Sequence, residues 1–364
     1  MDNIGLLMIY ANFHEGMSDA EMFRQETELG VLAEEVGFDC AWVPEHHFDV
    51  YAESPDNLQT LSYLAGRTSR IKLGTGAVIL PWNSPLRVVE KLLMLDHLSN
   101  GRAVFGMGRG LAAVEYEGFG IDMESSRARF DEAAPMIIRG LKTGIVEGDG
   151  PYYPQPRVEV RPAPDPNRPW EDRIFGVAMS PTSVPPVAEN GATMMTFIQY
   201  EVSKHAESVN EWRRLYREHH GVQPPPVMTL DACYCHQDPE EAERVARKYM
   251  TRHFTSIIQH YDMAGNHWRS TKGYENYQQD AEIIQAAGME AAAAGYPDTQ
   301  VFGTPEQIIE LYRERMDVLG EYSPTIQPSF GGMPFPMVRE SVRLFADKVI
   351  PELRKMTTKT VIGV

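Results

Sequence analysis

Two adjacent histidines in the segment Glu45-His46-His47-Phe48 are the first candidates for chemistry. An imidazole titrates near pH 6.5, so a histidine placed at a binding site can act as a general base. Neighbouring side chains of an extended segment point in different directions, so we expect one histidine to reach a site and the other to be structural. A hydrogen bond within a loop is the alternative role for either. Three consecutive residues do not converge easily on one ion, and no metal site is predicted.

A glycine-rich segment at 106–110 is the second candidate, because it contains Arg109. Its spacing matches neither the dinucleotide fingerprint nor the phosphate loop, and its glycines could simply allow a tight turn. Arg109 could nevertheless converge on a phosphate with Arg127, which follows Glu124 and could also be an ordinary surface charge. A third segment, 178–183, offers hydroxyls and the N–H groups of a helix start, which suit an anion.

Gly76 is unusual because it interrupts an otherwise apolar strand. A glycine at such a position can mark a bulge or the close approach of a flat ligand. Packing alone could equally require it.

The elements that must position these residues follow a repeating pattern of short apolar runs and longer segments with helical periodicity. This pattern is typical of βα units on a parallel sheet. Eight strands are predicted, at 4–9, 40–43, 72–80, 103–106, 174–178, 193–198, 227–234 and 325–329. Helices are predicted at 19–36, 57–67, 85–98, 125–141, 182–190, 203–220 and 238–259, after the cap at Thr304, and at 336–355.

Eight such units in one chain predict a single (β/α)8 barrel over residues 1–356, with a disordered tail at 357–364. Two insertions lengthen it: a Pro-rich loop at 151–169, after the fourth strand, and a polar, Ala-rich stretch at 260–298, after the helix that follows the seventh strand. A long stretch without a core pattern suggests a mobile lid. In such barrels the chemistry lies at the carboxyl ends of the strands, where all the candidate residues fall.

Composition and charge narrow the function classes. The chain has 364 residues, with 34 Lys plus Arg against 51 Asp plus Glu, and a formal net charge of -17. This charge repels nucleic acids and anionic membrane surfaces, so any phosphate must be held locally. Three cysteines and the absence of a signal sequence or an apolar run of membrane-spanning length indicate a reducing, cytoplasmic location.

The chain resembles the bacterial luciferase-like family of flavin-dependent monooxygenases from residue 1 to about residue 356. The similarity rests on ordered motifs: EEVGFD at 34–39, WVPEHHF at 42–48, LGTGAVILP at 73–81, FGMGRGL at 105–111, FGIDMESSR at 119–127, KGY at 272–274 and GTPE at 303–306.

This resemblance implies a barrel that binds FMN in its reduced form, FMNH2, supplied by a separate flavin reductase. O2 would be activated as a C4a-peroxyflavin beneath a lid at about 262–295, and a homodimer is expected. His46 takes the place of the family's catalytic histidine, and a non-prolyl cis peptide is expected at Gly76-Ala77. The implied cofactor-binding positions are Gly76, Ala77, Arg109, Leu111, Arg127, Ala178, Met179, Ser180 and Ser183.

Two departures from the family pattern bear on activity. Gly108 stands where luciferase α chains have a reactive cysteine, which weakens any expectation of light emission, and Met179 replaces a glutamate. The expected reaction is oxygenation of a small aldehyde, ketone, apolar or aromatic compound. A hydride-transfer oxidoreductase that uses the deazaflavin F420, and a non-catalytic partner subunit, are the alternatives.

Overall fold

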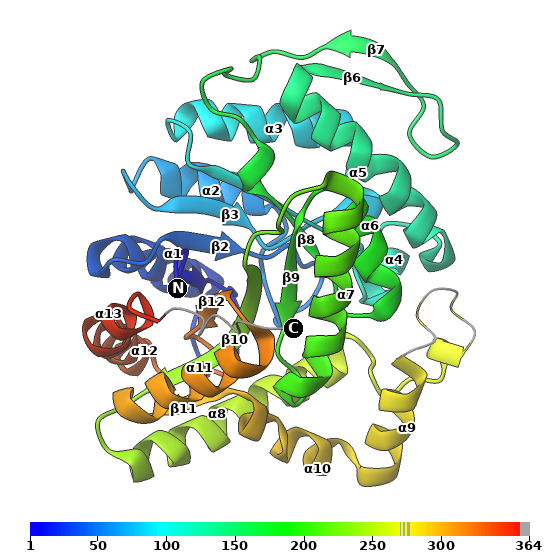
Figure 1. Ribbon diagram of the computed structural model, residues 1–364. Coiled ribbons are helices and arrows are strands. Elements are labelled where there is room, and N and C mark those ends of the chain that lie inside the picture. The colour runs from blue at the N-terminus through cyan, green and yellow to red at the C-terminus, as the bar shows by residue number, and fades with distance from the viewer. Residues whose placement is uncertain (270, 272–273, 275–276, 357–364) are drawn as a thin grey trace, which may run out of the picture.

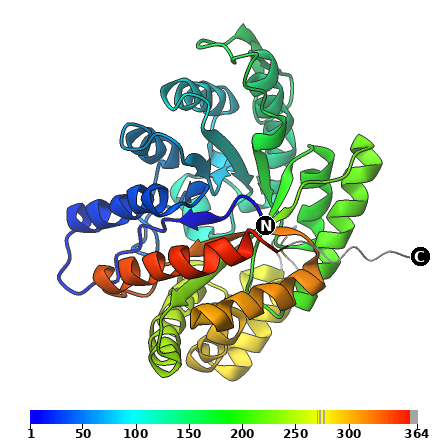
Figure 2. The same cartoon turned by 60° about the vertical axis from the view of Figure 1, so that its left-hand side comes forward.

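The computed structural model describes residues 1–269, 271, 274 and 277–356, and the predicted tail at 357–364 lies outside these. Eight parallel strands form a barrel in the order β10-β12-β1-β2-β3-β5-β8-β9, and the pairing of β9 with β10 closes it. Helices surround the barrel (Figures 1 and 2), as predicted for a (β/α)8 fold. The strands are β1 (Gly5–Leu7), β2 (Cys40–Val43), β3 (Lys72–Thr75), β5 (Ala103–Gly108), β8 (Ile174–Val177), β9 (Thr193–Phe197), β10 (Val227–Cys235) and β12 (Tyr322–Gln327).

The outer helices begin and end at residues suited to those positions. Ser18 and Asp238 each accept a hydrogen bond from the first turn of their helix, Thr304 forms a capping box, and Gly37 takes the left-handed conformation after the first helix. The helices are α1 (Asp19–Val36), α2 (Asn57–Ala65), α3 (Pro85–Leu98), α5 (Ser126–Thr143), α6 (Val184–Glu189), α7 (Val202–His220), α8 (Pro239–His260), α11 (Pro305–Leu319), α12 (Phe335–Leu344) and α13 (Ile350–Leu353). In the described part of the chain, no helix combines the length and hydropathy needed to cross a bilayer.

The third predicted strand is divided in two. β3 ends at Thr75, β4 (Val78–Ile79) pairs with β5, and the peptide bond between Gly76 and Ala77 is cis. The cis bond expected from the family resemblance is therefore confirmed.

Both insertions contain regular structure that the sequence pattern did not indicate. Within the predicted loop at 151–169, β7 (Gln155–Glu159) pairs with β6 (Ile145–Gly148) as an antiparallel ribbon outside the barrel (Figure 1). The loop prediction was wrong for this part, because an isolated two-stranded ribbon tolerates Pro156 on an edge strand. The second insertion contains α9 (Tyr277–Ala287) and α10 (Met289–Ala294), and β11 (Val301–Gly303), which follows it, pairs with β10.

One buried carboxyl group makes the fold sensitive to pH. Glu26 on α1 is fully buried, and this burial raises its pKa from the ordinary value of 4.5 to about 7. As pH rises, the unfolded chain loses this proton before the folded chain does. The free energy of unfolding is therefore expected to fall between about pH 4.5 and pH 7, and to change no further above that range.

The variant Glu26→Gln should lack this loss of stability. A pKa difference of this size corresponds to about 3 kcal/mol, so the variant should gain up to that amount relative to the wild type at pH 8 and little at pH 4. Urea unfolding followed by circular dichroism measures the difference, with exposed Glu35→Gln on the same helix as control. Equal pH dependence in the wild type and the Glu26 variant would contradict the assignment.

Candidate functional site

A large cavity opens at the carboxyl ends of the barrel strands. The empty space in it, including its open mouth, is about 1290 Å³. Seven of the predicted site residues line it: His46, Gly76, Ala77, Arg109, Leu111, Met179 and Ser183.

Glu45 fixes the loop that carries the two histidines. Its buried carboxylate accepts hydrogen bonds from Trp82 Nε1 at 2.7 Å, Asn83 Nδ2 at 2.8 Å and the Ile79 N–H at 3.0 Å. His47 Nε2 lies 3.3 Å from the same side chain. His47 is thus part of the loop's support, whereas His46 lines the cavity, as expected for neighbours on an extended segment.

His46 forms a buried pair with Glu115, a residue of the short helix α4 (Ala113–Gly118). His46 Nδ1 lies 3.0 Å from Glu115 Oε1, and the Tyr261 hydroxyl lies 3.3 Å from His46 Nε2. An ionised carboxylate can only accept hydrogen bonds, so Nδ1 carries the hydrogen in the neutral ring. Nε2 is then the nitrogen that can accept a proton.

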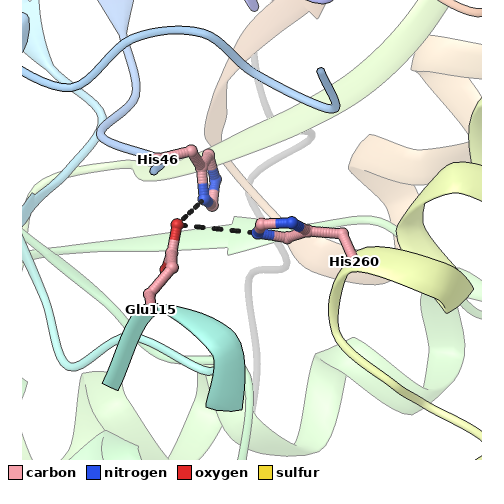
Figure 3. Close-up of side chains that lie close together, drawn as sticks. All are labelled: His46, Glu115 and His260. Carbon is pink, nitrogen blue, oxygen red and sulfur yellow. Dashed lines mark hydrogen bonds and ion pairs between the residues drawn. The ribbon is translucent and has the colours of Figure 1, made fainter. Parts of the chain in front are cut away.

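His260, at the end of α8, contacts the same carboxylate from the other side. Its Nε2 lies 3.6 Å from Glu115 Oε1, and its Nδ1 lies 3.1 Å from Asp49 Oδ2. Figure 3 shows both imidazoles directed at Glu115. Burial alone would raise the pKa of Glu115, but His46 and His260 lower it to about 2. The glutamate is therefore ionised at neutral pH and holds both rings.

These three side chains also have the composition of a two-histidine, one-carboxylate metal site, with their ligand atoms within 4.8 Å of one another. However, Glu115 Oε1 also accepts a hydrogen bond from the His47 backbone N–H at 2.8 Å, besides its contact with His46 Nδ1. In this structure, hydrogen-bond donors thus already engage that oxygen. We therefore describe the cluster as a hydrogen-bonded one, and the absence of a metal stays a prediction.

Metal removal tests this description. We expect the purified protein to contain no stoichiometric transition metal, and we expect dialysis against a chelator to leave flavin-dependent O2 consumption unchanged. Elemental analysis by mass spectrometry and an oxygen electrode give the two measurements. A metal at one equivalent per chain, lost in Glu115→Gln, would contradict the hydrogen-bonded description.

One end of the cavity is cationic and rich in hydroxyl groups. Arg127 Nη2 lies 3.5 Å from Ser183 Oγ, which lies 2.8 Å from Ser180 Oγ. Burial and the nearby Arg109 guanidinium lower the pKa of Arg127. Two like charges held this close, beside hydroxyl donors, are suited to one multivalent anion, and a flavin phosphate fits this donor set.

The remaining predicted contacts lie around this end. Arg127 reaches it through Ser183 and is not itself among the lining residues, while Ala178 and Ser180 are buried behind it. Met179 lines the cavity, and its sulfur lies 3.0 Å from the Phe197 backbone nitrogen. The methionine therefore holds the loop after β8 against β9.

The glycine-rich segment at 106–110 makes a tight turn and also packs closely against neighbouring side chains. Gly110 has a φ of +83°, and a Cβ there would lie 2.9 Å from Ile79 Cγ2 and 3.0 Å from the Trp82 ring. A larger residue would therefore push this segment away from β4 and into the cavity. The glycines can therefore form a tight turn while the same segment brings Arg109 to the cavity.

Part of the expected lid at 262–295 covers the cavity. Met263, Tyr274 and Tyr277 line it, and the Tyr274 hydroxyl donates to the Gly110 carbonyl at 2.8 Å. The Arg109 guanidinium lies 3.9 Å from the centre of the Tyr274 ring. Residues 270, 272–273 and 275–276 of the expected lid lie outside the described part of the chain.

Sequence reasoning missed Glu115, His260 and Tyr261. α4 has six residues, too few to show a helical period, so Glu115 could not be placed. The long helix was predicted to end at 259, one residue before His260. One feature of the sequence could have pointed to His260 and Tyr261: they are the first residues of the insertion at 260–298, which was expected to contain the lid.

Comparisons with known proteins agree with this geometry. The family model for luciferase-like monooxygenases matches residues 3–321. The alkanal monooxygenase alpha chain of Photobacterium leiognathi is 29% identical over 350 residues, which cover 93% of this chain and 96% of that protein.

Three solved structures have the same fold. Monooxygenase RslO1 from Streptomyces bottropensis has a TM-score of 0.71 at 27% identity, covering 96% of this chain and 99% of that one. The oxygenating constituent of 3,6-diketocamphane monooxygenase from Pseudomonas putida, in complex with FMN, has a TM-score of 0.75 at 17% identity, covering 96% and 98%. An F420-dependent secondary alcohol dehydrogenase has a TM-score of 0.69 at 17% identity, covering 97% and 99%.

Proposed function

The chain belongs to the luciferase-like monooxygenase family, and we propose that it is a two-component monooxygenase that uses FMNH2 from a separate reductase. Its substrate is a small organic compound, an aldehyde or ketone, or an apolar or aromatic molecule. One observation carries the proposal: the hydrogen-bonded pair of His46 and Glu115 lines the same cavity as Arg109 and Ser183.

Arg109, Arg127 and Ser183 would hold the flavin phosphate. Charge-assisted hydrogen bonds are stronger than neutral ones, so these residues would supply most of the flavin's binding affinity and would also fix its orientation. The two guanidiniums repel one another without an anion, which favours a dianionic ligand between them. This local cation pair resolves how a chain with a net charge of -17 could bind a phosphate.

Gly76 and Ala77 would lie beneath the flavin ring. Both residues of the cis peptide line the cavity that His46 and Arg109 also line. When bound, reduced flavin supplies the two electrons that reduce O2, so that one oxygen atom enters the substrate and the other leaves as water.

His46 would manage protons at its Nε2 atom. Glu115 holds the ring and keeps the hydrogen on Nδ1, so Nε2 is free to take a proton from the reacting groups and to return it. The 3.3 Å contact with the Tyr261 hydroxyl keeps this nitrogen hydrogen-bonded until a ligand binds.

Water exclusion is the remaining task of the cavity. Met263, Tyr274 and Tyr277 of the expected lid line the site, and so do apolar strand residues such as Leu7 and Leu230. Water would otherwise divert reduced flavin and O2 toward unproductive hydrogen peroxide.

Use of F420 is the second candidate, because an F420-dependent alcohol dehydrogenase shares the fold. Anaerobic titrations of the protein with FMNH2 and with reduced F420 should separate the two. We expect FMNH2 to bind more tightly and to be reoxidised faster when O2 is admitted. Tighter binding of reduced F420, with hydride transfer to a carbonyl compound in the absence of O2, would overturn the proposal. A non-catalytic subunit would bind flavin without oxidising any added substrate.

A further inference from the structure

The cluster of His46, Glu115 and His260 continues away from the cavity to Asp49. His260 Nδ1 lies 3.1 Å from Asp49 Oδ2, and neither His260 nor Asp49 lines the cavity. The side chains of Glu115 and His260 are 1% and 0% exposed, whereas the side chain of Asp49 is 35% exposed. The four side chains therefore lead from the cavity wall, through the interior, to a carboxylate in contact with solvent.

The two carboxylates beside His260 determine where its ring carries the hydrogen. The Tyr51 backbone N–H donates to Asp49 Oδ1 at 3.0 Å and fixes that carboxylate. An ionised carboxylate only accepts, so in the neutral His260 ring the hydrogen lies on Nδ1 and is donated to Asp49. Nε2 has no hydrogen-bond partner among the residues that the structure describes, and it faces Glu115 Oε1 at 3.6 Å. This buried nitrogen is therefore a vacant proton acceptor.

Aromatic contacts hold the His260 ring in this orientation. The Tyr51 ring is stacked on it, with centroids 4.6 Å apart, and the His46 ring stands at 90° to it. Each imidazole thus directs one nitrogen at the same Glu115 oxygen (Figure 3). Tyr261 also contacts the ring, but burial raises the pKa of both tyrosines, so they stay neutral. Proton exchange with His260 is left to the two carboxylates.

A cavity that excludes water needs another route for protons. In the function proposed above, His46 exchanges protons at Nε2 inside such a cavity, and its Nδ1 contacts Glu115. The two histidines lower the pKa of Glu115 to about 2 against the effect of its burial. A proton given to this carboxylate therefore does not stay there and moves on to one of the two rings. His260 Nε2 is the ring nitrogen that faces Glu115 from outside the cavity lining.

We propose that His260 and Asp49 relay protons between His46 and solvent without opening the cavity. This inference rests on the proposed function, because it supplies the route by which the proposed base is reset. His260 and Asp49 act through His46, so they are positioning residues and not catalytic ones.

The relay moves one proton and no electrons. When His46 Nε2 gains a proton, the proton on its Nδ1 moves to Glu115 Oε1 and then to His260 Nε2. The proton on His260 Nδ1 leaves through Asp49 Oδ2 to water, and a proton passed in the opposite direction restores both rings. The 3.6 Å gap between His260 and Glu115 closes to hydrogen-bond distance with a movement of about 0.5 Å, the size of ordinary thermal displacement.

Exchange of the His46 Nδ1–H proton with water tests the relay on the flavin-free protein. This hydrogen faces the buried Glu115 carboxylate, so in the wild type it leaves by way of His260 and Asp49. Asp49→Asn keeps the size of the side chain and an acceptor oxygen for His260, but it cannot carry a proton. We expect this variant to slow the exchange at least about tenfold. NMR magnetisation transfer on 15N-histidine-labelled protein measures the rate, and His46→Gln identifies the signal.

Two further variants separate the relay from a general effect of charge. Asp49→Glu keeps a carboxylate, and its exchange rate should stay within about threefold of the wild-type rate. Asp56→Asn is the matched control, because Asp56 is also 35% exposed but pairs with Lys91. Asparagine can also cap α2 in place of Asp56, so this variant should leave the exchange unchanged. His205, which contacts Thr196, should exchange at the same rate in every variant.

Oxygenation gives a second measurement. With FMNH2 and a substrate, Asp49→Asn should lower kcat about tenfold with little change in KM. The solvent deuterium isotope effect on kcat should rise at the same time, because proton transfer becomes the slow step. A merely structural role for Asp49 would lower kcat without raising the isotope effect.

No slowing of the His46 Nδ1–H exchange in Asp49→Asn would overturn the relay, and so would equal slowing in Asp56→Asn. If FMNH2 fails to support oxygenation while the exchange slows in Asp49→Asn alone, the proposed function fails and the relay stands. If oxygenation succeeds and Asp49→Asn changes neither the exchange nor the isotope effect, the relay alone fails.

Discussion

Replacing His46 with alanine is expected to lower kcat by about 10²- to 10⁴-fold, the range for loss of a positioned acid–base group. FMNH2 binding should remain nearly intact, because the contacts that would hold the phosphate are made by Arg109 and the loop after β8 and not by His46. Steady-state oxygenation and an anaerobic FMNH2 titration measure the two quantities.

The neighbouring histidine provides the control for this experiment. His47 contacts Glu45 and Trp82, and it does not line the cavity. His47→Ala should therefore lower the thermal unfolding temperature, and it should lower kcat much less than His46→Ala does. Unchanged turnover in the His46 variant, or equal loss of turnover in both variants, would reject the assignment of His46 as the base.

Replacing Arg109 with alanine is expected to weaken FMNH2 binding by about 1.5 to 3 kcal/mol, the value of one hydrogen bond to a charged group. Because Arg109 and Arg127 repel one another without a ligand, the flavin-free variant should lose little thermal stability through electrostatics. The anaerobic titration gives the affinity, and thermal unfolding of the flavin-free protein gives the stability.

An arginine elsewhere in the fold controls for the change in net charge. Arg157 on β7 is largely exposed on the ribbon outside the barrel, so Arg157→Ala should leave FMNH2 affinity unchanged. Equal affinities of the wild type and Arg109→Ala would show that this arginine does not hold the phosphate. A similar loss in Arg157→Ala would indicate a general effect of charge.

The barrel could be predicted because its strands are short, apolar and separated by helices with clear start and stop residues. Pro85 opens α3, and Gly37 follows α1 in the left-handed conformation. These signals are local, so they can be recognised in the sequence without knowledge of the tertiary fold. The ribbon of β6 and β7 was missed because its pairing is outside the repeating unit.

The candidate site could be predicted only in part. His46 and Arg109 stand directly after barrel strands, where the fold itself brings residues together. Glu115 and His260 are far apart in the sequence, and only the packing of α4 against the end of α8 joins them to His46. The hydrogen bond that sets the tautomer of His46 is similarly long-range, and no local pattern reveals it.

Isotope labelling tests the central claim most directly. The protein, FMN, a flavin reductase and NADH are incubated with an uncharged ketone or aldehyde under 18O2, and the products are examined by mass spectrometry. We expect a product that carries one oxygen atom from 18O2 and that forms only when the protein and reduced FMN are both present. A product that forms without O2, or one whose added oxygen comes from water, would contradict it.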